Sequence, residues 1–167
     1  MARAKKSPLA TTLKQNRPFV SLEQEVYLSI LRTASELSYA VDLFFRSFDI
    51  TASQYNVLRI LRGTGEEGLC RNEISERMVT ATPDMTRLLD RMEKAGWVTR
   101  ERAEEDRRQV STHITKSGME LLTRLEKPTG DFVMPLFAGA SISDLKIVLK
   151  VNDQIRAKLS RAAKGSI

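Results

Sequence analysis

The sequence has few of the residues that build metal sites, disulfide frameworks and membrane spans. Its 167 residues include one cysteine, Cys70, and one histidine, His113. A lone cysteine forms no internal disulfide, which suits a reducing cytoplasm, and a zinc site needs more clustered ligands than these two. The longest uncharged run, 132–143, is too short to cross a bilayer, and no secretory signal follows the basic N-terminus. We therefore expect a cytoplasmic protein without a metal or another cofactor.

Signs of enzyme chemistry are also missing. No nucleophile has a base at a suggestive spacing, and no glycine-rich loop is placed to bind a phosphate. The segment 63–65 contains two glycines, but it is short and follows a helical pattern instead of a strand. The sequence therefore predicts that the protein is not an enzyme.

The composition is that of a globular domain with an uneven charge. Hydrophobic residues make up 41% of the chain and charged residues 29%. Five of the 27 basic residues and none of the 21 acidic residues lie in residues 1–20. We expect this segment to be a flexible basic arm, which either contacts nucleic acid or only adds solubility. Net charge alone does not decide the function.

Long amphipathic helices are predicted at both ends of the chain. Ser21 and Gln24 have the spacing of a capping box, and the apolar pattern behind them indicates a helix of about 28 residues. Another helix is expected to start at Thr115 and to be interrupted or ended by Pro128, and a last helix to start at Ser143. The first helix is longer than a small core needs, which indicates a scaffold or a dimer arm.

The middle of the chain predicts short helices followed by a β-hairpin. A capping box at Thr51 opens one helix, a second covers 71–78, and a third runs from Pro83 to a glycine stop at residue 96. The segments 97–102 and 109–114 are β-prone and alternating. This order is the winged helix-turn-helix arrangement. The predicted fold class is therefore mainly α with a small β-hairpin wing.

The third of these helices has one apolar and one polar face. Residues at i, i+3, i+4 and i+7 face the core: Met85, Leu88, Leu89 and Met92. On the polar face, Arg87 can bind a guanine through two hydrogen bonds, and Thr86 can meet a thymine methyl or a phosphate. Phosphates would repel Asp90, so we expect it to orient Arg87 or Arg91. The candidate DNA-contact residues here are Pro83, Thr86, Arg87, Arg91 and Lys94.

The predicted hairpin loop has a second cluster of candidate contacts. Asp106, Arg107 and Arg108 lie at its tip. An arginine there can enter a minor groove while the carboxylate holds it in position. The same residues could instead form an exposed ion pair, which adds little to stability.

The ordered series of these segments closely resembles the MarR family of bacterial regulators. The matching segments are 50–54, 73–78, 85–98, 106–108 and 114–118. The resemblance implies a homodimer whose first, fifth and sixth helices interlock. It also implies that the two recognition helices bind a palindromic DNA operator about one duplex turn apart.

The resemblance also implies roles for six of the eight candidate DNA-contact residues. Thr86 and Arg87 would read bases, and Arg91 would help to hold the backbone. Arg108 would reach the minor groove with Asp106 as its anchor, and the arginine before it is the alternative tip residue. The wing also carries two glutamates, at 104 and 105, which should weaken its attraction for phosphates.

Many similar proteins bind a small aromatic or lipophilic anion between the dimer helices and the winged domain. Such an effector would shift the population between DNA-binding and non-binding spacings. The candidate lining residues are Tyr39, Phe44, Phe45 and Arg46. The same apolar stripe is also typical of a plain dimer core. Cys70 is expected to be a partly buried small residue and not a redox switch.

The predicted organisation is a basic arm (1–20), dimerisation helices (21–50 and 116–163) and a winged helix-turn-helix domain (51–115), in one compact unit. The predicted function is a DNA-binding transcriptional regulator, expected to be a repressor, that a small-molecule effector releases from its operator. The alternative is a winged-helix protein-interaction module that does not bind DNA.

Overall fold

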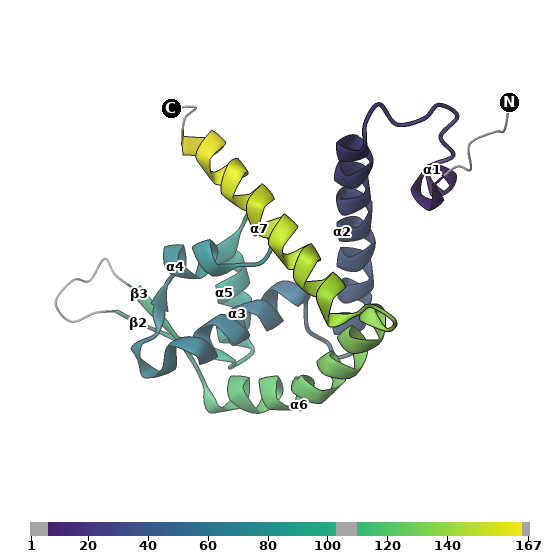
Figure 1. Ribbon diagram of the computed structural model, residues 1–167. Coiled ribbons are helices and arrows are strands. Elements are labelled where there is room, and N and C mark those ends of the chain that lie inside the picture. The colour runs from purple at the N-terminus through teal and green to yellow at the C-terminus, as the bar shows by residue number, and fades with distance from the viewer. Residues whose placement is uncertain (1–6, 103–109, 165–167) are drawn as a thin grey trace, which may run out of the picture. The chain divides into compact units, whose positions relative to one another are not determined.

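Helices and one small sheet follow each other in the order that the sequence predicts. The computed structural model describes residues 7–102 and 110–164 (Figure 1). The elements are α1 (Pro8–Thr12), α2 (Leu22–Arg46), α3 (Ala52–Thr64), the 3-10 helix η1 (Gly65–Glu67), β1 (Leu69–Cys70), α4 (Arg71–Arg77), α5 (Met85–Lys94), β2 (Val98–Arg102), β3 (Val110–Ile114), α6 (Lys116–Val133), the 3-10 helix η2 (Met134–Phe137) and α7 (Ile142–Lys164). The predicted fold class is confirmed.

Side-chain caps explain where α2 and α3 begin. The Ser21 hydroxyl accepts from the Gln24 N–H at 3.3 Å, and the Gln24 side chain accepts from the Val20 N–H at 2.8 Å. At α3 the capping box is complete. The Thr51 hydroxyl accepts from the Gln54 N–H at 3.2 Å, and the Gln54 side chain accepts from the Thr51 N–H at 2.8 Å. Both predicted starts are therefore confirmed.

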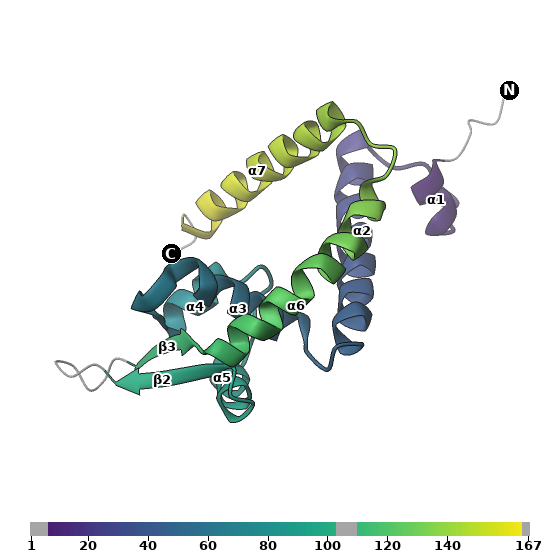
Figure 2. The same cartoon turned by 90° about the horizontal axis from the view of Figure 1, so that it is seen from below.

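The core of the chain up to residue 122 lies between the short helices and the sheet. Figures 1 and 2 show α3, α4 and α5 beside the β2–β3 hairpin in both views. The side chains with almost no exposure include Val57, Leu58, Leu61, Ile74, Met92, Val98 and Leu122. Phe45 at the end of α2 is buried against Tyr55 of α3, with ring centroids 4.5 Å apart. This stacking joins α2 to the winged part of the chain.

The sheet contains a third strand that the sequence did not predict. Its order is β1-β3-β2, all antiparallel, with Leu69 opposite Thr112 and Val98 opposite Ile114. β1 has two residues, too few to show an alternating pattern. Gly68 precedes it with φ of +65°, and a Cβ there would collide with the His113 ring. Only glycine fits this entry into the sheet.

Three predicted helix boundaries are wrong. α5 begins at Met85 instead of Pro83, because Asp84 caps it. α6 continues through Pro128 to residue 133, so this proline neither interrupts nor ends it. α7 begins at Ile142, one residue before the predicted start at Ser143, because Ser141 caps it. The Ser141 hydroxyl accepts from the Asp144 N–H at 3.1 Å, and the Asp144 carboxylate accepts from the Ser141 N–H at 3.0 Å. Ser143 lies inside the helix.

The chain is divided into two compact units, 1–122 and 123–167, where the sequence predicted one. The boundary between the two units falls inside α6. Within residues 7–20 of the predicted arm, the structure has the short helix α1. Among the described residues no single helix is long and apolar enough to cross a membrane; α6 with η2 and α7 meet the length and composition limits only as a bent pair.

Candidate nucleic-acid interface

Helix α5 exposes one face and buries the other, as the sequence predicts. Its apolar residues Met85, Leu88, Leu89 and Met92 are all buried. Asp84 caps the helix: one carboxylate oxygen accepts from the Arg87 N–H at 3.0 Å, and the other lies 3.6 Å from the Arg87 Nε. The cap and the apolar face together fix which side of α5 points to solvent.

All five candidate residues of this helix region are exposed. They are Pro83, Thr86, Arg87, Arg91 and Lys94. The Arg87 side chain is 81% exposed although it lies near Asp84. The Arg91 Nε donates to the Arg87 carbonyl at 3.3 Å. The polar face of α5 is thus available to a partner.

The predicted wing-tip residues lie outside the described part of the chain. These residues are Asp106, Arg107 and Arg108. The structure describes the strands on either side of them, β2 and β3, which pair from Val98–Ile114 to Arg102–Val110. The predicted roles of the three residues remain predictions.

Arg100 on β2 is an important residue that the sequence analysis missed. Its Nη2 lies 2.7 Å from an Asp90 carboxylate oxygen, and its Nε donates to Glu93 at 2.9 Å. The hydrogen bond from Arg100 holds the pKa of the Glu93 carboxyl below its usual range, and the same contact raises the pKa of Arg100. The expected pairing of Asp90 with Arg87 or Arg91 is therefore wrong. Arg100 joins strand β2 to helix α5 instead, through Asp90 and Glu93.

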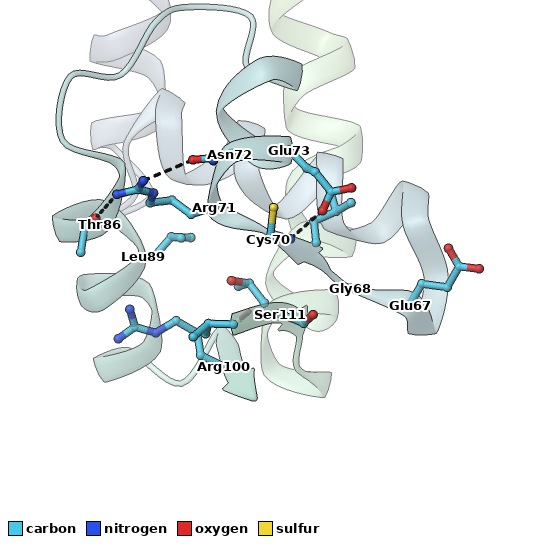
Figure 3. Close-up of a pocket in the computed structure, with 13 residues that line it drawn as sticks. Glu67, Gly68, Cys70, Arg71, Asn72, Glu73, Thr86, Leu89, Arg100 and Ser111 are labelled. Carbon is cyan, nitrogen blue, oxygen red and sulfur yellow. Dashed lines mark hydrogen bonds between the residues drawn. The ribbon is translucent and has the colours of Figure 1, made fainter. Parts of the chain in front are cut away.

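A cavity of about 850 Å³ lies beside α5, between α4, β1 and β3. Figure 3 shows Arg71 of α4 pointing across it toward α5. The Arg71 Nη1 donates to the Thr86 hydroxyl at 3.4 Å, and its Nη2 donates to the Asn72 side chain at 3.2 Å. Arg71 could not be recognised from the sequence, because its contact with Thr86 spans 15 positions and leaves no local pattern.

Cys70 lies at the other side of this cavity, directly before α4. The Glu73 carboxylate accepts from the Cys70 N–H at 2.8 Å, and this bond holds the pKa of Glu73 below its usual range. The Cys70 side chain is half-buried, as expected. No group of three or more potential metal ligands occurs in the residues that the structure describes.

The segment 114–118 fastens α6 to the end of α5. The Thr115 hydroxyl donates to the Gly96 carbonyl at 2.6 Å and accepts from the Gly118 N–H at 3.1 Å. The Thr115 N–H donates to the Trp97 carbonyl at 3.0 Å. A Cβ at Gly118 would collide with that same carbonyl oxygen. Thr115 and Gly118 therefore hold the start of α6 against the segment that follows α5.

The four candidate effector residues occupy different environments in α2. Tyr39 is 68% exposed and Arg46 is exposed. Phe45 is only 4% exposed, and its ring contacts both Phe44 and Tyr55. Phe45 is thus part of the core. Phe44 is half-buried beside it, whereas Tyr39 and Arg46 are exposed.

Two short helices joined by a turn, followed by a β-hairpin, define a winged helix-turn-helix protein. The model of the MarR family matches residues 50–110. The chain is 34% identical to a MarR transcription factor from Planctomyces limnophilus, over 82% of this chain and 99% of that one, with a TM-score of 0.63. The chain belongs to the MarR family, which confirms the resemblance found in the sequence.

Other relatives agree with this assignment. The chain is 26% identical to the HTH-type transcriptional regulator PapX of Escherichia coli, over 78% of this chain and 79% of that protein. A MarR family regulator from Streptomyces coelicolor, solved in complex with DNA, has the same fold, with a TM-score of 0.76 and 22% identity over 87% of this chain and 92% of that one. The protein is a transcriptional regulator and not an enzyme.

Proposed function

We propose that the protein binds a palindromic DNA operator as a homodimer, with one helix α5 in the major groove of each half-site. The observation that carries this proposal is the exposed polar face of α5 in a winged helix-turn-helix. Thr86 and Arg87 lie near the start of that helix, the end from which recognition helices contact base edges. The regulator from Streptomyces coelicolor, which shares the fold, was solved with DNA.

The site residues divide by the kind of contact that their chemistry permits. Arg87 offers two parallel donors to a guanine, and Thr86 offers a methyl and a hydroxyl. Arg91 and Lys94 lie further along α5 and suit phosphates of the backbone. At the wing tip, Arg108, or Arg107 as the alternative, would enter the minor groove with Asp106 as its anchor.

Exposed apolar side chains on the long helices support the homodimer. On α2 they include Val26, Tyr27, Ile30, Leu31, Leu37 and Leu43. On α7 they include Ile147, Val148, Leu149, Val151, Ile155 and Leu159. Leaving this much apolar surface in water is unfavourable, and a second copy of the chain would cover it. A dimer of this kind presents two α5 helices to one duplex.

Repression and release by an effector are the finer parts of the proposal. A small aromatic or lipophilic anion bound near Tyr39, Phe44 and Arg46 would change the spacing of the two DNA-binding heads. The cavity beside α5 is a second location for such a ligand, because Thr86 is among its lining residues. A regulator of this kind acts on DNA in the cytoplasm. Thermal unfolding with a panel of aromatic acids tests the effector; no shift with any of them would contradict it.

The experiment for operator binding is selection of bound duplexes from a random pool, followed by a salt titration of the enriched sequence. Enrichment of a palindrome and a steep loss of affinity with added salt are expected. Absence of enrichment, with negligible binding at low salt, would favour the alternative of a protein-interaction module.

A further inference from the structure

Arg71 is placed beside the candidate DNA-reading face by its contact with α5. It is the first residue of α4, and its exposed side chain reaches the Thr86 hydroxyl at 3.4 Å. Figure 3 shows the guanidinium between the side chains of Thr86 and Asn72. Thr86 lies in the first turn of α5. Arg71 therefore lies at the end of α5 that is proposed to enter the groove.

Among the residues that the structure describes, no carboxylate pairs with Arg71, in contrast to Arg87 and Arg100. Arg100 binds both Asp90 and Glu93, and Arg87 lies 3.6 Å from Asp84. Over residues 7–102 and 110–164, the acceptors found for Arg71 are the neutral side chains of Thr86 and Asn72. The distance to Thr86 is long for a hydrogen bond, and the distance to Asn72 is at the upper end of the usual range. A guanidinium with five donors and two neutral acceptors can still bind an anion.

We propose that Arg71 is a further DNA-contact residue, which binds a phosphate beside the groove that α5 enters and holds the Thr86 hydroxyl. This inference rests on the proposed binding of DNA by α5. In a helix-turn-helix, the helix before the recognition helix crosses the DNA backbone, and α4 has that position here. An arginine there can bind a phosphate with two parallel hydrogen bonds.

The contact with Thr86 gives Arg71 a second effect, on sequence preference. A phosphate contact carries no base information by itself. However, the hydrogen bond from Arg71 holds the hydroxyl oxygen of Thr86 in one orientation. Since the hydroxyl and the methyl group are attached to the same carbon, the direction of the methyl group is then held as well. Arg71 thus positions Thr86, so its loss is expected to weaken both the overall affinity and the preference at the base pair that Thr86 meets.

The test compares Arg71→Gln with Arg77→Gln on the full chain and the selected operator duplex. Both substitutions remove one positive charge from α4, but Arg77 lies in its last turn. For Arg71→Gln we expect affinity to fall about 10-fold or more. We also expect the slope of log K against log salt to become shallower by about 0.9 for each half-site. For Arg77→Gln we expect a slope close to that of the parent. Thermal unfolding of both exposed variants should match the parent.

A double-mutant cycle with Thr86→Val tests the positioning of Thr86. If Arg71 holds the Thr86 hydroxyl, Arg71→Gln costs less affinity in the Thr86→Val background than in the parent. Equal losses in both backgrounds would overturn that part. Parent-like affinity and slope for Arg71→Gln, or equal losses for Arg71→Gln and Arg77→Gln, would overturn the phosphate contact. If the parent protein enriched no duplex, the proposed function would be wrong, and the proposed phosphate contact of Arg71 would be wrong as a consequence.

Discussion

The winged domain and the two long helices differ in what happens to their apolar side chains. The apolar face of α5 is buried within the chain, and so are Leu58 and Leu61 of α3. In α2, by contrast, only Phe45 is buried, and α7 exposes Leu149 and Leu159. All four helices are amphipathic in sequence, so the pattern alone does not tell them apart. Burial separates an apolar surface that is covered within one chain from an exposed one, which the proposed homodimer would cover.

The largest expected effect comes from making the α7 surface polar. Ile155→Glu with Leu159→Glu should convert the dimer to a monomer. Burying each of these side chains contributes about 1.5–3 kcal/mol. The free energy of dimerisation should therefore weaken by about 3 kcal/mol or more, and the dimer dissociation constant should rise at least 100-fold. Sedimentation equilibrium measures this. Gln154→Glu with Lys158→Gln, which changes the net charge equally on neighbouring positions, is the control. A dimer of unchanged affinity would mean that the exposed surface of α7 is not the interface.

The next effect concerns the joint between α5 and α6. Gly118→Ala places a Cβ against the Trp97 carbonyl oxygen, which is backbone and cannot move aside. We expect a loss of about 1–3 kcal/mol in the free energy of unfolding, measured in urea. Gly63→Ala is the control, since a Cβ there meets nothing within 4 Å and helical alanine is favoured over glycine. Equal stability of the two variants would show that the joint is not tightly packed.

An effect of similar size, but confined to one base pair of each half-site, is expected on the exposed face of α5. Arg87→Ala should relax the base preference at one position of each half-site, at a cost of about 1–3 kcal/mol per contact. Competition with duplexes substituted one base pair at a time measures this preference. Lys94→Ala, at the other end of α5, should instead weaken all duplexes alike. An unchanged preference in Arg87→Ala would remove Arg87 from base reading.

The smallest effect is expected where the wing meets α5. Because Arg100 lowers the pKa of Glu93, their pair stabilises the fold above the usual pKa of a glutamate. That contribution is lost as the pH falls through the lowered pKa. Arg100→Met should cost about 1 kcal/mol at neutral pH and progressively less below about pH 4. Urea unfolding across this range, with Arg32→Met as an exposed control, measures it. A pH-independent cost would assign the loss to packing alone.

Features that depend on near neighbours in the chain could be predicted, and contacts between elements could not. The capping box at Thr51 and the apolar face of α5 follow from spacings of three or four residues, and the structure confirms both. The pairing of Arg100 with Asp90 and the contact of Arg71 with Thr86 join different elements, so no periodic pattern reports them.

Helix ends were predictable only where one capping residue was available. Thr82 and Asp84 are both residue types that cap helices well. In the structure Asp84 is the cap of α5, because its side chain accepts from the Arg87 N–H. The same ambiguity between Ser141 and Ser143 arises at α7. Pro128 was expected to stop α6, but a proline removes one backbone donor, and the helix on both sides of it is long enough to continue.

The most direct test of the dimeric operator binder is a change in the spacing of its two half-sites. In the selected palindrome, five additional base pairs between the half-sites turn the second one to the opposite side of the duplex, since one turn is about 10–10.5 base pairs. If two α5 helices on one dimer bind together, affinity should fall to that of a duplex with a single half-site. Unchanged affinity for the lengthened duplex would contradict the account, because each half-site would then be bound independently.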